Sequence, residues 1–426
     1  MKEEGAVPFN WVIVGASFIA LALVYSVWYS FAVFFVTLLK EFGWSRSLGA
    51  GAFSLFSISG CVVAPLVGGL ISSLGPQRVL LLGALFLGAG LALCSLMTNW
   101  WQFYLYFGII AAVGLGASGW IAHVTIIQLW FKEKRGLATG IISSGIGIGI
   151  LVSPPAVQHL ILRFGWRLTY RLMAIFIPLV IIIIAVAVLK KKPPIHPLRS
   201  SDTGPSPPNF RDPFLLDNRW AARSWTFQQA MATKPFWLLG FSFFLGNFMT
   251  QSIFAHQVAF FIDHGLEAVF ASYLVGIVGI VSLGGKILWG TLSDRIGREI
   301  TYTLGMIFFI TGIALLICFS VFRSGNLPYL YSICFGMGYA VTAALPPLIT
   351  ADFFEGPAYG SIFGSIMVFI GVGGALGAWF AGLLYDWTLS YVPAFVIMGV
   401  CGLISCVSVW NAGPRKVRMV PGRVRK

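Results

Sequence analysis

The chain has 426 residues, of which 58% are hydrophobic and only 10% are charged. Because a soluble domain carries about 25% charged residues, this composition excludes an ordinary soluble protein and favours one embedded in a lipid bilayer. The net charge of +14 does not indicate nucleic-acid binding, since no aromatic platform accompanies the basic clusters.

Apolar segments long enough to cross a hydrocarbon core of about 30 Å recur along the chain. Twelve of them are expected to be transmembrane helices, at about 10–37, 47–72, 78–98, 101–130, 136–162, 169–189, 236–262, 267–291, 301–321, 328–351, 360–385 and 390–411. The predicted fold class is therefore all-α: a polytopic membrane protein with two six-helix bundles. The expected divisions are an N-terminal bundle at 1–189, a cytoplasmic linker at 190–234, a C-terminal bundle at 235–412 and a basic cytoplasmic tail at 413–426.

The linker is polar and rich in proline, so we do not expect it to pack. Within it, residues 225–233 fit either a short amphipathic surface helix or plain linker. With the N-terminus inside the cell, most Lys and Arg residues fall on the cytoplasmic side, which predicts that both termini are cytoplasmic. The basic clusters at 190–192 and 415–426 also suit contact with anionic lipid.

Motifs for enzymatic chemistry are missing from the sequence. The six cysteines fall inside predicted spans without Cys-x-x-Cys spacing, which indicates packing rather than a metal or redox site. There is no phosphate-binding loop, no zinc-spaced set of His and Cys, and no Gly-x-Ser-x-Gly elbow. We therefore expect neither an enzyme nor a metal, and no cofactor.

A faint internal repeat joins the two halves. The segment 68–78 and the segment 290–298 both place glycines seven residues apart around a cytoplasmic turn that ends in Arg. A turn glycine can adopt backbone angles that other residues avoid, and an Asp–Arg pair can hold neighbouring helices together. The second segment supplies a predicted conformational latch, formed by Gly290, Asp294, Arg295, Gly297 and Arg298. A six-plus-six arrangement with this loop resembles the major facilitator superfamily, whose halves are related by an axis along the membrane normal.

Three further stretches resemble the monocarboxylate transporter family and its bacterial relatives, including oxalate:formate antiporters. They are the segment 41–46, the segment 130–149, and His256 with Asp263 and Lys286. The resemblance implies that Lys286 occupies a position where the family usually has Arg, and that Asp263 matches an acidic position at the outer end of the seventh span. Animal members carry a Lys near 28–30, and oxalate transporters carry one in the eleventh span; this chain has neither. A single buried cation favours a monoanion over a dianion.

Lys286 is the only Lys or Arg in the predicted eighth span. A charge at membrane depth costs about 3 kcal/mol or more, so it is kept where it has a role. Lys286 precedes Asp294 by about 12 Å of ideal helix, which predicts a position near the bilayer midplane. Two interpretations are open: a substrate-binding cation, or a structural ammonium paired with a carbonyl or carboxylate. Ser282, one turn earlier, is a candidate for the same ligand.

Three other polar residues have two interpretations each. His256 and Asp263 lie about 10 Å apart on one helix face. His256 suits proton coupling because the unperturbed pKa of histidine is about 6.5, but it also suits polar packing. Asp263 fits either a proton-sensing outer gate or a solvated helix end. His123, on the fourth span, fits either the substrate cavity or packing.

Aromatic and amide residues complete the candidate pocket, although most aromatic stripes in such a chain are packing or interfacial belts. These candidates for substrate binding are Tyr29, Trp120, Asn247, Gln251, Tyr331, Phe335 and Tyr339. The last three repeat every four residues and so share one helix face.

The predicted function is secondary active transport of small organic monocarboxylates by alternating access, coupled to protons. The expected partners are a small organic anion, a proton and the lipid bilayer, with a monomer in a cell membrane that we expect to be a bacterial inner membrane. Two other functions stay open: an exchanger of organic anions or exporter of metabolites or drugs, and a membrane sensor that does not transport.

Overall fold

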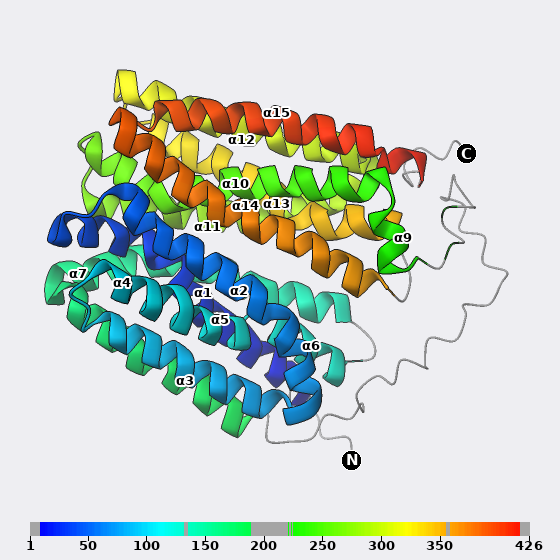
Figure 1. Ribbon diagram of the computed structural model, residues 1–426, viewed down its shortest axis with the longest axis horizontal. Helices are drawn as coiled ribbons and strands as arrows, with labels where there is room; N and C mark the ends of the chain where they lie inside the picture. Colours follow the sequence, from blue (N-terminus) through cyan, green and yellow to red (C-terminus); the bar gives the residue numbers. More distant parts are fainter. Residues whose placement is uncertain are drawn as a thin grey trace, which may run out of the picture. The chain divides into compact units, whose positions relative to one another are not determined.

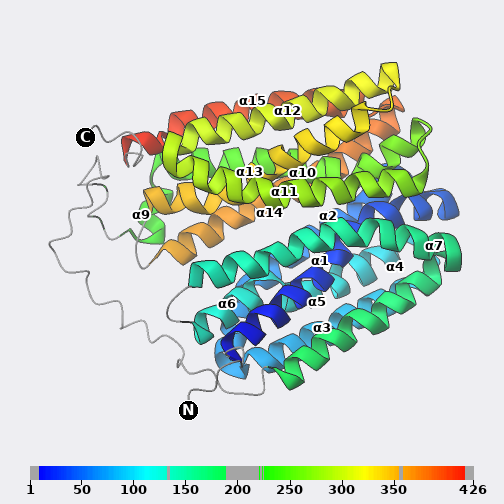
Figure 2. The ribbon, with the colours of Figure 1, turned by 180° about the vertical axis from the view of Figure 1, so that it is seen from behind.

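The computed structural model describes residues 9–131, 135–188, 220, 223, 225–354 and 358–417, and throughout these residues it is helical, without β-strands. The all-α prediction is confirmed. Most of the predicted linker, and the tail after residue 417, lie outside the described residues. The chain divides into two compact units (Figures 1 and 2). One takes in Met1–Trp44, Leu48–Arg199 and Glu267–Gly276, and the other takes in Ser45–Ser47, Ser200–Leu266 and Ile277–Lys426.

The first unit is built mainly from the N-terminal helices, and its core pairs α1 with α7 and α3 with both α5 and α7. In chain order the helices are α1 (Phe9–Phe42), α2 (Arg46–Leu74), α3 (Pro76–Cys94), α4 (Trp100–Phe103), the π-helix η1 (Tyr104–Ala111), α5 (Ala112–Ser118), α6 (Trp120–Trp130) and α7 (Arg135–Ala187).

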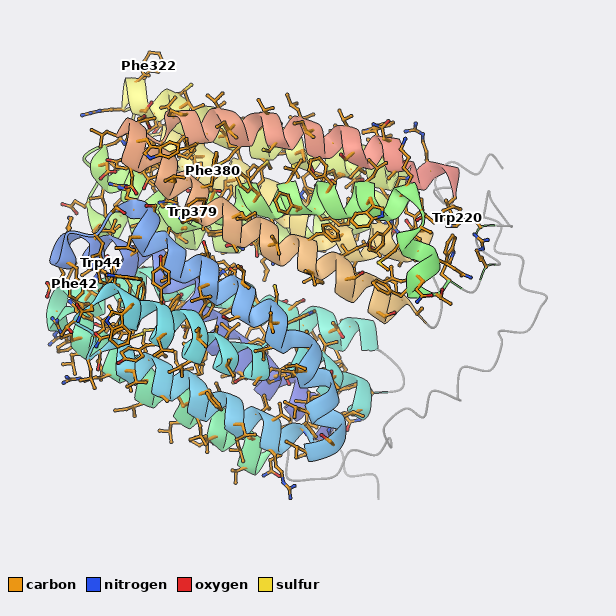
Figure 3. The ribbon with its side chains drawn as sticks, in the orientation of Figure 1. Phe42, Trp44, Trp220, Phe322, Trp379 and Phe380 are labelled. Carbon is orange, nitrogen blue, oxygen red and sulfur yellow. The ribbon has the colours of Figure 1, made fainter. Side chains whose placement is uncertain are left out.

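The second unit is built around α10, which packs against α14, α15 and α13. Its elements are α9 (Phe227–Met231), α10 (Lys234–Asp263), α11 (Ala268–Ile296), α12 (Arg298–Phe322), α13 (Leu327–Phe353), α14 (Tyr359–Thr388), α15 (Val392–Ala412) and the short 3₁₀ turn η2 (Pro414–Lys416). Trp220 lies at the end of the unit that holds α9 (Figure 3), and its indole donates a 2.7 Å hydrogen bond to the carbonyl of Phe353.

Eleven helices among the described residues are long and apolar enough to cross a membrane. The segment Leu137–Ala187 counts once among them although its 51 residues far exceed the roughly 20 that one crossing needs. Gly165 explains the length: it has φ 77° and ψ 161° inside α7, so the chain turns there while the helical assignment continues. These angles are open to glycine and strained for other residues. The turn divides α7 into two spans, which correspond to the fifth and sixth helices predicted at 136–162 and 169–189.

The fourth predicted span, 101–130, is not one continuous helix. It begins as α4, widens into the π-helix η1, returns to α5 and breaks at Gly119, which has φ −90° and ψ −152°. A π-helix and a glycine break each interrupt the regular hydrogen-bond ladder, and π-helical turns are found often at functional sites. His123 lies one turn after the break, on α6.

Glycines bring helices into backbone contact at several places in both units, and one pair in each unit shows a matching arrangement. A β-carbon at Gly145 would lie 2.3 Å from the carbonyl oxygen of Phe18, and at Gly149 2.6 Å from that of Ala22, so α7 meets the bare backbone of α1. The same arrangement recurs between α14 and α10. There, a β-carbon at Gly373 would lie 2.3 Å from the oxygen of Phe244, and at Gly377 2.1 Å from that of Phe248. Small residues allow such close approach in membrane helix pairs.

Candidate functional site

Lys286 lies on α11, in the part of the helix that belongs to the second unit. Its Nζ lies 5.1 Å from the ring centroid of Tyr339 on α13, within the range of a cation–π interaction. The Tyr339 ring is fixed in turn by Phe254 on α10, which meets it edge-on at 5.0 Å. Among the described residues Lys286 forms no ion pair. The ammonium is therefore held by an aromatic face, and no protein carboxylate in the described chain neutralises it.

The other predicted pocket residues of this unit use their polar groups within the protein. The Ser282 hydroxyl donates to the carbonyl of Gly279 at 2.8 Å, and the Asn247 amide donates to the carbonyl of Ile370 at 2.7 Å. Gln251 is different. Its Nε2 lies 3.5 Å from Asn247 Oδ1, while its buried Oε1 has no hydrogen-bond partner among the residues that the structure describes. Gln251 therefore retains an acceptor that a ligand hydroxyl or a water molecule would satisfy.

Tyr331 and Phe335 are fully buried, and their rings stack on each other at 5.5 Å. The Tyr331 hydroxyl donates to Oε1 of Gln257 at 2.7 Å, so this side chain ties α13 to α10. Although both residues share a helix stripe with Tyr339, neither has a surface that a ligand could touch in this structure. The structure thus separates the three predicted aromatic residues into two packing residues and one neighbour of Lys286.

Tyr29, Trp120 and His123 belong to the first unit. Tyr29 is buried on α1, and Trp120 is half-buried at the start of α6. His123 is completely buried, and neither of its ring nitrogens has a hydrogen-bond partner among the described residues. A buried imidazole with two unsatisfied nitrogens is unusual in a packed interior and indicates a group that a ligand, water or proton would complete.

His256 and Asp263 lie in a polar cluster at one end of α10. The Asp263 carboxylate accepts a 2.6 Å charged hydrogen bond from Arg46. His256 is buried, with Nδ1 2.9 Å from the Tyr391 hydroxyl and Nε2 2.8 Å from the carbonyl of Ala378. Arg46 also donates to the Tyr391 hydroxyl, and its guanidinium lies 3.8 Å from the ring centroid of Tyr385. We call Arg46, His256, Asp263, Tyr385, Asp386 and Tyr391 the Arg46 cluster.

Four members of this cluster were not predicted from the sequence. Arg46 stands in the family-like segment 41–46, and Tyr385, Asp386 and Tyr391 stand at or near the ends of predicted spans. Their contacts with α10 or with Arg46 join residues more than 120 positions apart in the chain. The available signal was weak: both Asp386 and Tyr391 are polar residues at the ends of apolar spans.

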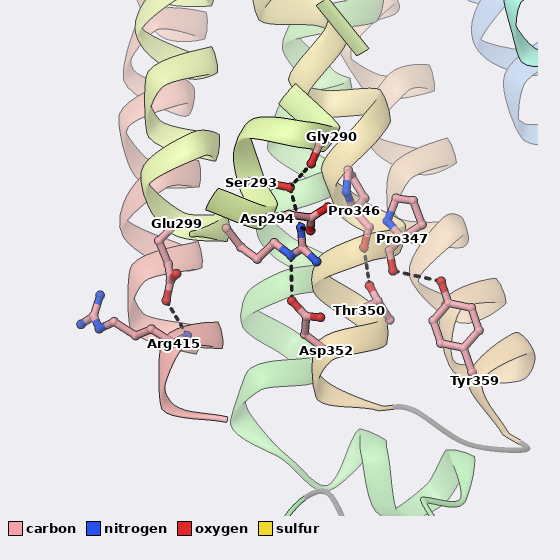
Figure 4. A network of polar contacts seen from close by, with 11 residues as sticks. Gly290, Ser293, Asp294, Glu299, Pro346, Pro347, Thr350, Asp352, Tyr359 and Arg415 are labelled. Carbon is pink, nitrogen blue, oxygen red and sulfur yellow. Dashed lines mark hydrogen bonds and ion pairs between the residues drawn. The ribbon is translucent and has the colours of Figure 1, made fainter. Parts of the chain in front are cut away.

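The predicted latch residues lie where α11 ends and α12 begins, and Arg298 contacts the Ser293, Asp294 and Asp352 side chains that Figure 4 labels. Arg298 donates to Asp294 at 2.7 Å and to the Ser293 hydroxyl at a similar distance, and its Nε donates to Asp352 of α13 at 2.8 Å. Arg295 is exposed and forms no ion pair among the described residues. Asp352 is therefore the partner that sequence reasoning missed.

We call Arg298 and its partners Ser293, Asp294 and Asp352 the Arg298 cluster. Two glycines lie close to it in the chain. Gly290 lies on α11 and accepts, through its carbonyl, a 2.7 Å hydrogen bond from Ser293. Gly297 separates α11 from α12 with φ 105° and ψ 155°, angles that let the chain reverse within one residue. The turn places Arg298 at the first position of α12, where it faces both Asp294 and Asp352.

Comparison with known proteins decides the family. The sequence model of the Major Facilitator Superfamily matches residues 17–354. The chain belongs to the major facilitator superfamily. The predicted fold, two six-helix bundles of this superfamily, is confirmed. A crystal structure of "a bacterial homolog to human lysosomal transporter, Spinster" in an inward-facing, unoccupied conformation is 16% identical. It superposes with a TM-score of 0.74, with 98% of this chain and 100% of that chain covered.

Within the superfamily, the chain is similar to curated monocarboxylate transporters over almost its whole length. Monocarboxylate transporter 13 of Rattus norvegicus is 26% identical, with 96% of this chain and 92% of the relative covered. Monocarboxylate transporters 12 and 3 of the same organism are 25% and 27% identical; 94% and 93% of this chain are covered, and 84% and 79% of the relatives. The predicted resemblance to this family is confirmed, and the chain is a multi-pass membrane transporter.

Proposed function

We propose that this transporter carries small organic monocarboxylates of the lactate or pyruvate class, by alternating access and together with a proton. The observation that carries the proposal is the state of Lys286: an ammonium on a membrane helix, held over Tyr339 and without an ion pair in the described chain. A carboxylate is the natural partner for such a group, because their attraction is strong where water is scarce. The similarity to monocarboxylate transporters supports the same substrate class.

The charge balance around Lys286 favours a monoanion. One ammonium neutralises one carboxylate, and a second carboxylate on the same substrate would stay unpaired in a site of low dielectric constant. The Tyr339 ring next to the ammonium, with the Phe254 ring packed against it, suits a short apolar chain attached to the carboxylate. Lysine also differs from arginine in offering a point charge rather than a two-pronged fork, so orientation of the carboxylate depends more on the surrounding groups.

The proton is assigned to the Arg46 cluster. His256 is a buried imidazole in hydrogen-bond contact with Tyr391, and Asp263 is a carboxylate in contact with Arg46. A proton bound at either residue changes the charge of a network that joins the ends of α10, α14 and α15. We place this cluster at the outer end of the protein and the Arg298 cluster at the cytoplasmic end, with both termini inside, in agreement with the distribution of Lys and Arg along the chain.

Reconstituted proteoliposomes test the proposal. An inward pH gradient, acidic outside, is expected to drive uptake of radiolabelled lactate or pyruvate into vesicles that contain no internal anion. Collapsing the gradient with a protonophore should reduce the initial rate to that measured with equal pH on both sides of the membrane. If uptake required internal anion at every pH tested, the mechanism would be exchange and not symport. Absence of saturable flux for any short monocarboxylate would remove the substrate assignment.

A further inference from the structure

The hydrogen bonds of the Arg46 cluster have fixed directions. A carbonyl can only accept, so Nε2 of His256 must carry the hydrogen that reaches Ala378, at 2.8 Å. A guanidinium can only donate, so the bond between Arg46 and the Tyr391 hydroxyl uses a lone pair of the Tyr391 oxygen. The Tyr391 hydrogen is then free to be donated to Nδ1 of a neutral His256, 2.9 Å away. The chain of donors runs from Arg46 through Tyr391 to His256.

Arg46 is seated in this cluster by more than its side chain. The Asp386 carboxylate accepts from the backbone N–H of Arg46 and from that of Ser47, each at 2.8 Å. A β-carbon at Gly382 would lie 2.8 Å from the backbone of Arg46 and Ser47, so only glycine allows α14 to come this close. The segment 45–47 belongs to the second unit for this reason.

A second proton on His256 is incompatible with these directions. Both ring nitrogens would then donate, and Nδ1–H would claim the oxygen of Tyr391. The Tyr391 hydrogen would lose its acceptor, and the imidazolium and the guanidinium would share one oxygen, with two positive charges facing each other. Like charges at such separation repel by several kcal/mol outside bulk water. The favourable response is for Arg46 to leave Tyr391.

We propose that the Tyr391 hydroxyl couples the protonation of His256 to the release of Arg46, so that Tyr391 is the residue through which a bound proton changes the protein's conformation. This inference rests on the proposed function in assigning the proton to His256. It adds Tyr391 and Arg46, which act as positioning residues rather than as proton carriers.

The remaining titratable groups near Tyr391 and His256 fit this assignment. Asp263 and Asp386 hold Arg46 through its side chain and its backbone, and Tyr385 contributes a ring face to its guanidinium. His264 directs its Nδ1 to the carbonyl of Phe260 and, in the part of the chain that the structure describes, has no hydrogen bond to Tyr391. Burial raises the pKa of Tyr391 although Arg46 opposes this effect, so the phenol keeps its proton at neutral pH.

A cysteine introduced as Ser47→Cys reports the release directly. Ser47 is held through its backbone N–H, and the hydrogen bond of its hydroxyl within the described chain is to that of Ser45, so the substitution leaves the Asp386 contacts in place. The full-length protein, purified in detergent, is labelled with a membrane-impermeant maleimide at a series of values from about pH 7.5 down to about pH 4, because an imidazolium at His256 faces the Arg46 guanidinium and so forms only in stronger acid than for a solvated histidine. Protein without Ser47→Cys gives the background of the six native cysteines, and rates are corrected for thiolate content.

The same measurement is made in Tyr391→Phe, His256→Gln and, as the matched control, Tyr385→Phe, whose ring also contacts Arg46 but whose hydroxyl has no hydrogen bond in the described chain. We expect the corrected labelling rate to rise about threefold or more at acidic pH in the parent and in Tyr385→Phe, as a population shift toward released Arg46. In Tyr391→Phe and His256→Gln the rate should change little with pH.

An equal acid response in Tyr391→Phe and the parent would overturn the inference, as would a parent that shows no response. Uptake assays separate this failure from that of the proposed function. If uptake is driven by protons but labelling does not depend on pH, only the proposed coupling through Tyr391 is excluded. The opposite result is also distinguishable. If labelling depends on pH and Tyr391→Phe abolishes that dependence, but flux does not respond to the pH gradient, the Tyr391 coupling stands and proton symport is excluded.

Discussion

Arg298 donates from Nε to Asp352 at 2.8 Å, although the two residues lie on different helices and 54 positions apart. The Asp352 side chain is only 8% exposed, whereas that of Asp294, the other carboxylate bound to Arg298, is 62% exposed. Because a buried partner cannot be replaced by water, the two carboxylates should contribute unequally to the stability of the Arg298 cluster.

Asp352→Asn is therefore expected to destabilise the protein by about 1.5–3 kcal/mol, in the range for a hydrogen bond to a charged group. Asp294→Asn should change the stability by less than about 1 kcal/mol, as for other exposed ion pairs. Thermal unfolding in detergent, followed by the fluorescence of a thiol-reactive dye, measures both variants. If Asp294→Asn and Asp352→Asn reduced the stability equally, burial of the carboxylate would not determine how much each contact contributes.

Removal of the Lys286 ammonium tests the substrate site. Lys286→Ala should reduce monocarboxylate uptake about tenfold or more while the melting temperature stays close to that of the parent, because no ion pair of the described chain is lost with it. Lys286→Arg should retain part of the uptake, since the charge remains but its shape changes. Lys234→Ala, at an exposed position on α10, is the control. Normal uptake by Lys286→Ala across all acids tested contradicts the proposed site.

A buried hydroxyl network gives a prediction on stability alone. Tyr302 of α12 and Ser405 of α15 lie 2.7 Å apart, and Ser405 lies 2.8 Å from the hydroxyl of Ser242 on α10. Tyr302→Phe leaves both serines partly unsatisfied in a buried place and should cost about 1–3 kcal/mol. Tyr106→Phe, on the π-helix, is the matched control and should cost less than about 0.5 kcal/mol. A melting temperature unchanged by Tyr302→Phe would mean that the serines satisfy each other without it.

Backbone contact between α10 and α14 predicts a steric effect. Gly377→Ala would bring a methyl group to 2.1 Å from the carbonyl oxygen of Phe248, so the helices must separate. We expect a loss of about 1–3 kcal/mol and a reduced yield of folded protein, as for other overpacked positions. Gly399→Ala, where no atom lies within 4 Å, should be tolerated and controls for the intrinsic difference between glycine and alanine. Fluorescence-detected gel filtration compares the two variants. Similar profiles would show that the backbone contact between α10 and α14 does not limit stability.

The sequence was informative where chemistry is local. The isolated charge of Lys286 and the turn from Gly290 to Arg298 could be recognised, because a lone charge in an apolar span and a glycine-rich turn are visible within a few residues. Asp352 and Tyr391 could not, because their partners are 54 and more than 130 positions away in the chain. Nothing in a single sequence says which helix ends meet.

Helical periodicity also had a limit. It placed Tyr331, Phe335 and Tyr339 on one stripe, but a stripe on α13 meets several neighbouring helices along its length. Tyr331 and Phe335 are packed against each other, and only Tyr339 meets Lys286. Likewise, hydropathy gave the extent of the span 101–130 but not its π-helix or its break at Gly119, since neither changes the average polarity of the segment.

Gly145 and Gly149 form a glycine seam between α7 and α1, and Gly373 and Gly377 form one between α14 and α10. These seams help to interpret variants of this protein. The same offset along the chain separates Gly145 from Gly373 and Gly149 from Gly377, so the seams supply a residue-level register between the halves that identity of side chains does not give. A substitution characterised at one position of a seam thereby acquires a named counterpart in the other half. The stability of such variants, measured singly and in pairs, then shows whether close helix packing matters equally in the two halves.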